Sequence, residues 1–209
     1  EYVLAWLLGI ERGVIRRADT SRWDGSLERG IGGRRLGIMG TGSIGRAVAR
    51  GCEALGLLVS GLNSDGRSVD GFRACFATAD RIEFASGLDY LVALLPDTAA
   101  ACNLFDADLL HCLARGAIFI NAGRADTVVD SDLLDALYGG QLRAAVLDVT
   151  RVEPLPPGDV FWTTENLYVT SHTAAPSFAE DVVEVFAENY RRYVRGEPLQ
   201  YRIDFERGY

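Results

Sequence analysis

The sequence predicts an α/β protein built on a mostly parallel sheet with helices on both faces. Short apolar runs of strand length recur along the 209 residues, and segments with helical spacing separate them. Several of these runs end at a glycine, a proline or a polar residue, which indicates that the chain leaves a buried strand there. Strands that alternate with helices in this way are typical of a doubly wound parallel sheet.

The order of the elements follows from these runs. Residues 2–17 carry apolar side chains near helical spacing and predict an N-terminal helix, whereas the composition of residues 18–33 predicts a loop. Strands are predicted at residues 36–39, 57–62, 89–96, 116–123, 142–149 and 166–172. Further helices are predicted in the segment after Gly42 and at residues 106–114, 130–140 and 177–196.

Composition excludes several classes of function. A formal net charge of −8 makes nucleic acid an unexpected partner, and no apolar run reaches the length of a membrane span. The sequence contains no lysine, which excludes Schiff-base and P-loop lysine chemistry. Cysteine spacing matches no zinc pattern, so no metal site is expected. Reduced thiols and the lack of a signal-peptide pattern favour a cytoplasmic protein.

A glycine-rich stretch lies between the first predicted strand and the following helix. It consists of Gly40, Thr41, Gly42, Ser43, Ile44 and Gly45. In a dinucleotide-binding turn the first glycine permits the tight turn, the second lets the backbone approach a pyrophosphate, and the third allows close helix–strand packing. A glycine-rich turn without a ligand is the alternative. The flanking strand and helix favour dinucleotide binding and a Rossmann-like sheet.

The residues after the second strand bear on the choice of cofactor. Asn63 stands where an Asp or Glu would bind the ribose hydroxyls of NAD. Asn63 does not repel a 2′-phosphate, Ser64 can donate a hydrogen bond, and Arg67 is close enough in sequence to pair with phosphate. These residues favour NADP. NAD stays possible if Asp65 takes the ribose role.

Three later strand ends carry polar residues. Arg124 follows one strand, Asp148 and Glu153 follow the next, and His172 comes just after the last. Ligands of open α/β sheets bind where strands end at their carboxyl side, so these residues are candidates for a hydride-transfer site. Singly, each could be an ordinary surface or loop residue. Their order and their shared strand-end position favour catalysis.

The stretches "GTGSIG", "LLPDT", "INAGRAD", "LDVTRVEPLP" and "SHTAA" together resemble the D-isomer-specific 2-hydroxyacid dehydrogenases, over essentially the whole chain. The pattern "EPLPPGDVFW" and the ending "IDFERGY" are most similar to the glyoxylate/hydroxypyruvate reductases of that family. The resemblance implies hydride transfer between NAD(P)H and a small 2-oxo acid, which gives a 2-hydroxy acid.

The resemblance also implies roles for individual residues. Arg124 would bind the substrate carboxylate or keto oxygen, His172 would act as the acid/base, and Glu153 would fix the tautomer of His172 and favour its protonated form. Asp148 would hold the nicotinamide end of the cofactor. Further cofactor contacts would come from Leu95, Pro96, Thr98, Ala122, Gly123, His172 and Ala174.

Some positions depart from the family pattern. Ala125 replaces the glycine usual after the arginine, and Ala101 stands where a threonine is frequent. Thr150, Arg151 and Val152 replace an aromatic and acidic stretch before Glu153. We expect these changes to affect the affinity for ligands more than the assignment to the family.

The resemblance predicts the domain organisation. Residues 1–175 would form the dinucleotide-binding domain, with an N-terminal helix that pairs two copies in a homodimer. Residues 176–209 would form a helix and tail that return to a largely absent substrate domain. Family members begin with a substrate-domain half that is missing here, so this polypeptide is expected to bind cofactor but turn over poorly. The alternative is a dinucleotide-sensing, corepressor-like module without turnover.

Overall fold

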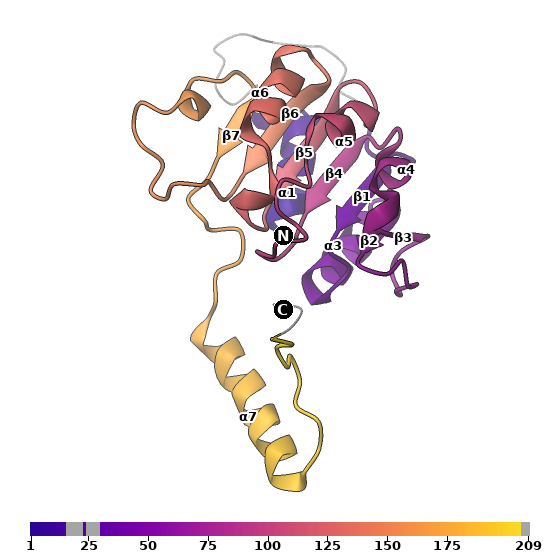
Figure 1. Cartoon of the computed structure of the whole chain (residues 1–209), viewed down its shortest axis with the longest axis vertical. Helices are drawn as coiled ribbons and strands as arrows, with labels where there is room; N and C mark the ends of the chain where they lie inside the picture. Colours follow the sequence, from indigo (N-terminus) through magenta and orange to yellow (C-terminus); the bar gives the residue numbers. More distant parts are fainter. Residues whose placement is uncertain (16–22, 24–29, 206–209) are drawn as a thin grey trace.

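The computed structural model describes residues 1–15, 23 and 30–205. Within this part of the chain, seven parallel strands form one sheet in the order β3-β2-β1-β4-β5-β6-β7 (Figure 1). The strands are β1 (Arg35–Met39), β2 (Leu58–Asn63), β3 (Cys75–Ala77), β4 (Tyr90–Ala93), β5 (Ala117–Asn121), β6 (Leu142–Leu147) and β7 (Leu167–Val169). The predicted doubly wound parallel sheet is confirmed.

The described helices lie before the first strand, between the strands and beyond the last one. They are α1 (Tyr2–Glu11), α3 (Ser43–Ala54), α4 (Arg81–Ala85), α5 (Ala107–Cys112), α6 (Asp130–Tyr138) and α7 (Ala179–Arg195). Short 3-10 turns are η1 (Thr78–Asp80), η2 (Ala125–Thr127) and η3 (Val160–Trp162). The six predicted strands and the later helices are confirmed within a few residues. The sequence analysis missed β3 and α4, which are only three and five residues long.

The N-terminal helix is interrupted rather than continuous, because residues 12 and 13 form a turn and residues 14 and 15 are helical again. Its first part, α1, ends at Glu11, and Gly13 then takes a φ of 62°, a left-handed conformation that glycine adopts without strain. Residues 16 and 17, and most of the loop predicted at 18–33, lie outside the described residues.

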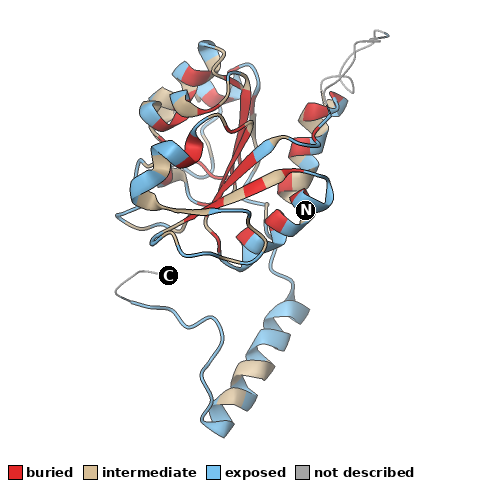
Figure 2. Ribbon diagram, turned by 90° about the vertical axis from the view of Figure 1, so that its right-hand side faces the viewer, coloured by how far each residue is buried: buried red, intermediate tan, exposed pale blue. Residues whose placement is uncertain are grey.

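The central strands β4 and β5 are buried on both faces because helices cover both faces of the sheet (Figure 2). Two consecutive residues of β4, whose side chains point to opposite faces of the sheet, show this directly. Leu91 packs in the cluster beneath α4, α5 and α6, whereas Val92 packs in the cluster beneath α1 and α3. Both side chains are fully inaccessible to solvent. This two-sided burial explains why the strands have continuous apolar sequences without a polar alternation.

The first helix, α1, is fixed to its own domain through one face. Val3, Leu7 and Glu11, at four-residue spacing, are its buried residues. Glu11 is only 1% exposed, and its Oε1 accepts hydrogen bonds from the Tyr90 hydroxyl at 2.6 Å and from Arg143 Nη2 at 2.7 Å. The helix therefore belongs to the core of this domain, and its opposite face, which includes Leu8, is exposed.

The last helix, α7, projects away from the sheet, and an extended segment after β7 leads to it (Figure 1). None of its residues is buried, although Phe186, Tyr190 and Tyr193 are apolar or aromatic. The following segment runs back along the helix, where Asn189 exchanges hydrogen bonds with the backbone of Gln200 at 3.2 and 2.7 Å. Within the described residues, α7 thus has an apolar surface that no other element covers.

Candidate active site

A cavity of about 450 Å³ opens at the carboxyl edge of the sheet. It lies where β1 and β4 are neighbours and the chain leaves them toward opposite sides, the point at which open α/β sheets bind ligands. The predicted site residues that line it are Gly40, Thr41, Gly42, Ile44, Asn63, Ser64, Arg67, Leu95, Pro96, Thr98, Ala122, Gly123 and Arg124. The sequence analysis did not assign Thr78, Ala100 and Leu104 to the site, although they line it too.

Glycine geometry explains the shape of the turn after β1. Gly40 has a φ of 111°, and a Cβ there would lie 2.8 Å from the Leu94 carbonyl oxygen. A Cβ on Gly45 would lie 1.9 Å from the Gly40 oxygen, whereas a Cβ on Gly42 would meet nothing within 4 Å. Gly40 and Gly45 are therefore required by the fold itself. Gly42 faces open space in the cavity, as a residue that must admit a ligand would.

The same turn leads into a helix that can bind an anion. Gly42 is the N-cap of α3 and provides no side-chain hydrogen bond to the first turn. The N–H groups of that turn therefore lack a side-chain partner at the helix end that carries positive partial charge. Since the cavity is lined by Gly42 and Ile44, a pyrophosphate there would meet these groups. The residues present fit a dinucleotide.

The loop after β2 is ordered by Asn63. Its Nδ2 donates to Thr41 Oγ1 at 3.2 Å and to the Arg67 carbonyl at 2.9 Å, and its Oδ1 accepts from the Asp65 N–H at 3.3 Å. Asn63 thus joins this loop to the glycine turn. Arg67 Nη1 pairs with Asp65 Oδ2 at 3.1 Å, and the N–H and guanidinium of Arg67 lower the pKa of that carboxyl.

The loop that carries Arg124 is ordered by a buried amide. Asn121, at the end of β5, accepts from the Gly123 N–H at 2.9 Å and donates to the Arg124 carbonyl at 3.1 Å. Thr127 Oγ1 donates to the same carbonyl at 2.7 Å. These bonds fix the backbone, while the exposed Arg124 side chain lines the cavity.

Glu153 and His172 form a pair at the same edge of the sheet. His172 Nδ1 lies 2.9 Å from Glu153 Oε2, and the Thr150 N–H donates to Glu153 Oε1 at 3.0 Å. These two bonds lower the pKa of the Glu153 carboxyl, the His172 bond contributing most. A carboxylate can only accept, so Nδ1 carries the proton and Nε2 is left for a substrate. The two side chains are 52% and 40% exposed, so the pair is open to water.

Asp148 holds the loop that contains His172. It is 2% exposed, and its carboxylate accepts from Thr170 Oγ1 and from the N–H groups of Thr173 and Ala174. The Tyr2 hydroxyl of α1 lies 2.8 Å from Thr170 Oγ1. Burial raises the pKa of Tyr2 to about 12. The sequence analysis did not predict this loop-holding arrangement, because its donors come from segments distant in sequence.

Some predicted site residues lie outside the cavity. Ser43, Gly45, Asp148, Glu153, His172 and Ala174 do not line it. Ser43 and Gly45 lie in the first turn of α3. The other four lie around β6 and β7, on the far side of the Arg124 loop in the strand order. The cavity and the Glu153–His172 pair therefore flank Arg124.

This combination defines a class of protein: a Rossmann-type dinucleotide-binding domain with an acid/base pair at its ligand-binding edge. Residues 3–174 match the family model of the D-isomer specific 2-hydroxyacid dehydrogenase, NAD binding domain. The chain belongs to that family, as the sequence resemblance predicted.

Curated relatives and solved structures agree with this assignment. The chain is 33% identical over 174 residues to glyoxylate/hydroxypyruvate reductase A of Serratia proteamaculans, covering 83% of this chain and 56% of the relative. A family member from Aeromonas salmonicida is 38% identical, with a TM-score of 0.88, and is matched over 98% of this chain and 67% of its own. The NADPH-dependent glyoxylate/hydroxypyruvate reductase of Sinorhizobium meliloti, solved with NADP and sulfate, is 32% identical with a TM-score of 0.89. The match covers 100% of this chain and 68% of the Sinorhizobium chain.

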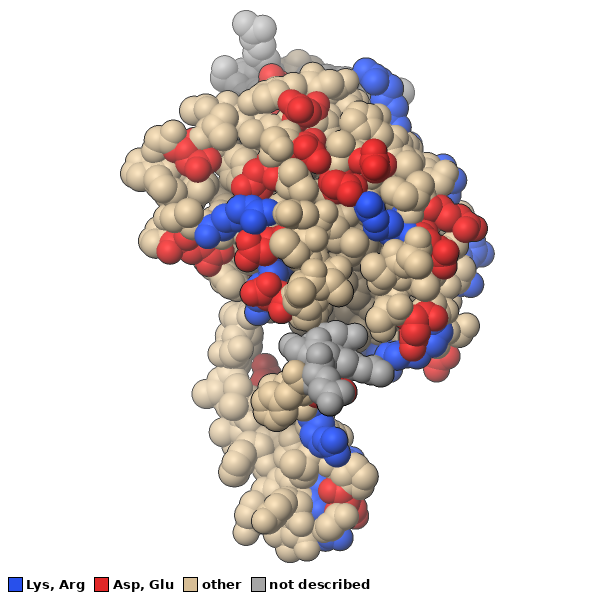
Figure 3. Space-filling model, viewed as in Figure 1, with Lys and Arg blue, Asp and Glu red and all other residues tan. Residues whose placement is uncertain are grey.

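Three further observations concern partners and metals. No helix in the described part of the chain is long and apolar enough to cross a membrane. The same residues contain no group of three or more potential ligands that could hold a metal ion. On the face shown in Figure 3, arginines are interspersed with acidic residues over the sheet domain.

The two glycines make a matched test of the cavity. Gly42→Ala should change the free energy of unfolding by no more than ~0.5 kcal/mol, because a Cβ meets no neighbour there. It should raise the dissociation constant for NADPH about tenfold or more, since the methyl group enters the ligand space. Gly45→Ala should instead destabilise the fold by about 1–3 kcal/mol.

Denaturant unfolding and fluorescence titration measure the two quantities. Unchanged NADPH binding by a folded Gly42→Ala variant would show that the cofactor does not approach this turn.

Proposed function

We propose that this chain provides the cofactor-binding and acid/base half of an NADP(H)-dependent reductase that converts a small 2-oxo acid of the glyoxylate or hydroxypyruvate type to a 2-hydroxy acid. The observation that carries the proposal is that the Glu153–His172 pair, Arg124 and the cavity with its glycine turn all lie at the carboxyl edge of one parallel sheet. The chain spans 56% and 61% of the first curated relatives it matches. The names of those relatives support the substrate class.

The proposed chemistry assigns one task to each side chain. Arg124 binds the carboxylate of the 2-oxo acid, because a guanidinium presents donors that match two oxygens. When bound, the nicotinamide supplies the hydride that reaches the carbonyl carbon. The protonated His172 gives the Nε2 proton to the carbonyl oxygen as that oxygen gains charge. The imidazole then stays neutral with Nδ1–H directed at Glu153, and solvent restores the Nε2 proton. The reverse sequence oxidises the 2-hydroxy acid.

The proposed cofactor is NADP rather than NAD. Ser64 and Arg67 line the end of the cavity beside β2, where the adenosine ribose of a dinucleotide lies in this fold. A 2′-phosphate there would compete with Asp65 for the Arg67 guanidinium. The Sinorhizobium reductase, whose structure contains NADP, supports this choice.

A second candidate function is dinucleotide binding or sensing without turnover, as in a corepressor-like module. The exposure of the Glu153–His172 pair favours it for this chain alone, because electrostatic catalysis is strongest where water is excluded. Turnover measurements separate the two candidates.

We propose residues 1–175 as the dinucleotide-binding domain and residues 176–209 as a helix and tail that pack on a substrate domain. The uncovered apolar side chains of α7 support this division, as does the greater length of the relatives.

We further propose a homodimer formed through α1, and a cytoplasmic location in keeping with four free cysteines.

Replacing His172 tests the acid/base assignment. His172→Ala should lower kcat for NADPH-dependent reduction of glyoxylate or hydroxypyruvate about 100- to 10,000-fold, because the proton donor is lost. Cofactor affinity should stay nearly unchanged, since His172 does not line the cavity. His111→Ala is the matched control, because His111 lies on α5 and its Nδ1 contacts the Ala107 carbonyl of the same helix, at 2.7 Å. Turnover that survives in His172→Ala refutes the assignment.

Two charge variants test the cofactor preference. Arg67→Ala should weaken NADPH binding up to about fivefold and leave NADH binding unchanged, since exposed charge pairs contribute at most ~1 kcal/mol. Asp65→Asn should strengthen NADPH binding, because Arg67 no longer has a competing carboxylate. Calorimetric titration with both cofactors measures these effects. If Asp65→Asn weakened NADH binding instead, Asp65 would be the ribose ligand and NAD the cofactor.

Sedimentation equilibrium tests the proposed dimer. At micromolar concentration the chain should sediment as two copies, and Leu8→Glu, on the exposed face of α1, should shift it to the monomer. A wild-type chain that sediments as a monomer argues against pairing through α1.

A further inference from the structure

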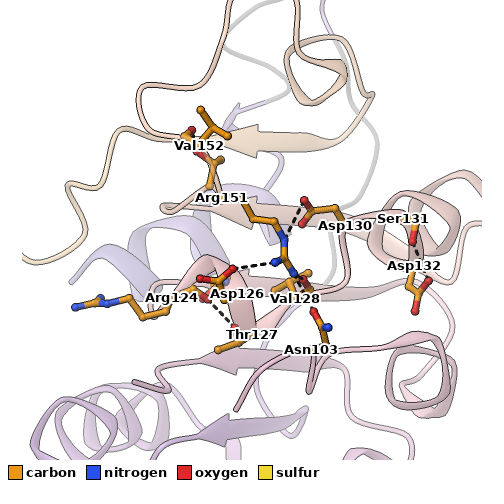
Figure 4. Close-up of polar contacts among 12 residues, drawn as sticks. Asn103, Arg124, Asp126, Thr127, Val128, Asp130, Ser131, Asp132, Arg151 and Val152 are labelled. Carbon is orange, nitrogen blue, oxygen red and sulfur yellow. Dashed lines mark hydrogen bonds and ion pairs between the residues drawn. The ribbon is translucent and has the colours of Figure 1, made fainter. Parts of the chain in front are cut away.

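Arg151 joins the two loops that carry the proposed active-site residues. Its Nη1 pairs with Asp126 Oδ1 at 2.8 Å, and its Nη2 donates to the Val128 carbonyl and, at 2.9 Å, to Asn103 Oδ1. Its Nε lies 3.4 Å from Asp130 Oδ2. Figure 4 shows this guanidinium at the centre of the cluster. One side chain thus connects the segment before Glu153 with the segment after Arg124.

On the Glu153 side, the contacts continue to the imidazole. Thr150 Oγ1 donates to the Val152 carbonyl at 2.8 Å, and the Thr150 N–H donates to Glu153. Residues 150–153 therefore form a closed turn that presents Glu153 to His172. Arg151 lies within this turn, and it fixes the turn to the body of the domain.

On the Arg124 side, Arg151 pairs with the carboxylate of Asp126. Asp126 is two residues from Arg124 and is the acidic group of the same loop. In Figure 4 the Arg124 side chain points away from Asp126, whose carboxylate faces Arg151. Within the described part of the chain, the Arg124 guanidinium donates to the Gly123 carbonyl, at 2.8 Å, and to no carboxylate. Because the Asp126 carboxylate forms an ion pair with Arg151, the Arg124 guanidinium stays available to a substrate anion.

We propose that Arg151 is a positioning residue that holds Glu153 against His172 and keeps Asp126 from pairing with Arg124. The inference rests on the proposed function, because it concerns the same site. Neither neighbour could replace Arg151 in this role, since Thr150 and Val152 carry no charge. A lysine could pair with one carboxylate but could not contact four groups at once, because it lacks the planar fork of arginine.

The first test observes His172 directly and needs no cofactor. Long-range 1H–15N spectra of the full chain report which imidazole nitrogen carries the proton, and only two histidines contribute. Neutral His172 should be the Nδ1–H tautomer in the wild type. Arg151→Ala should shift it toward the Nε2–H tautomer, and Arg151→Lys should give an intermediate shift.

Arg34→Ala is the matched control. Arg34 makes an ion pair of 2.7 Å with Asp89 at the opposite edge of the sheet, where β1 and β4 begin. Its loss should cost stability without changing the His172 tautomer. An unchanged tautomer in folded Arg151→Ala and Arg151→Lys overturns the proposal.

The second test uses charge rescue. Arg151→Ala should raise KM for glyoxylate about tenfold, since Asp126 would then compete for Arg124. The double variant Arg151→Ala/Asp126→Asn should recover most of that loss, and NADPH affinity should be unaffected in both. If Arg151→Ala does not fold, Arg151→Lys and Arg151→Lys/Asp126→Asn take its place. If instead KM rose and kcat and NADPH affinity fell by similar factors, and Asp126→Asn restored none of them, Arg151 would have a merely structural role and the proposal would be overturned.

The two proposals can fail separately. A wild-type chain that shows the Nδ1–H tautomer but neither binds NADPH nor reduces glyoxylate refutes the proposed function. It leaves the tautomer comparison between Arg151 variants intact.

Discussion

The parallel direction of every described strand pairing is the constraint on which the site depends. It brings the carboxyl ends of β1, β2, β4, β5, β6 and β7 to one edge, so that segments from residues 40 to 174 meet there. Helices on both faces bury the strands and leave only their ends for chemistry. The glycine turn, Arg124 and the Glu153–His172 pair all follow strands, and each is presented by the strand before it.

Buried polar groups then fix the loops that leave this edge. Asn121 orders the Arg124 loop, and Asp148 orders the segment that contains His172. Each sits at or just beyond the end of its strand, is almost inaccessible to solvent and satisfies backbone groups that would otherwise lack partners. In this way the rigidity of the sheet extends a few residues into the loops, which the proposed hydride-transfer site would require.

Most of the fold and much of the lining of the candidate site could be predicted from local patterns. Long apolar runs such as residues 116–123 gave correct strands, because burial on both faces demands continuous apolar sequence. Thr78 and Leu104 were missed as cavity residues, and β3 was missed as a strand, because short half-buried segments carry no clear periodicity. Helix 2–17 was predicted as continuous although the chain turns at residues 12 and 13, since the helical spacing outweighed Gly13.

The sequence by itself determined the alternation of strands and helices, the glycine turn and the identity of the Arg124, Glu153 and His172 side chains. These are local signals, because each depends on residue types at short spacing. Only the tertiary structure decided that Asp148 binds Thr170 and Ala174, that Arg151 joins two loops, and that α7 has an uncovered apolar surface. Those contacts join residues that are distant along the chain, and their geometry exists only once the sheet has formed.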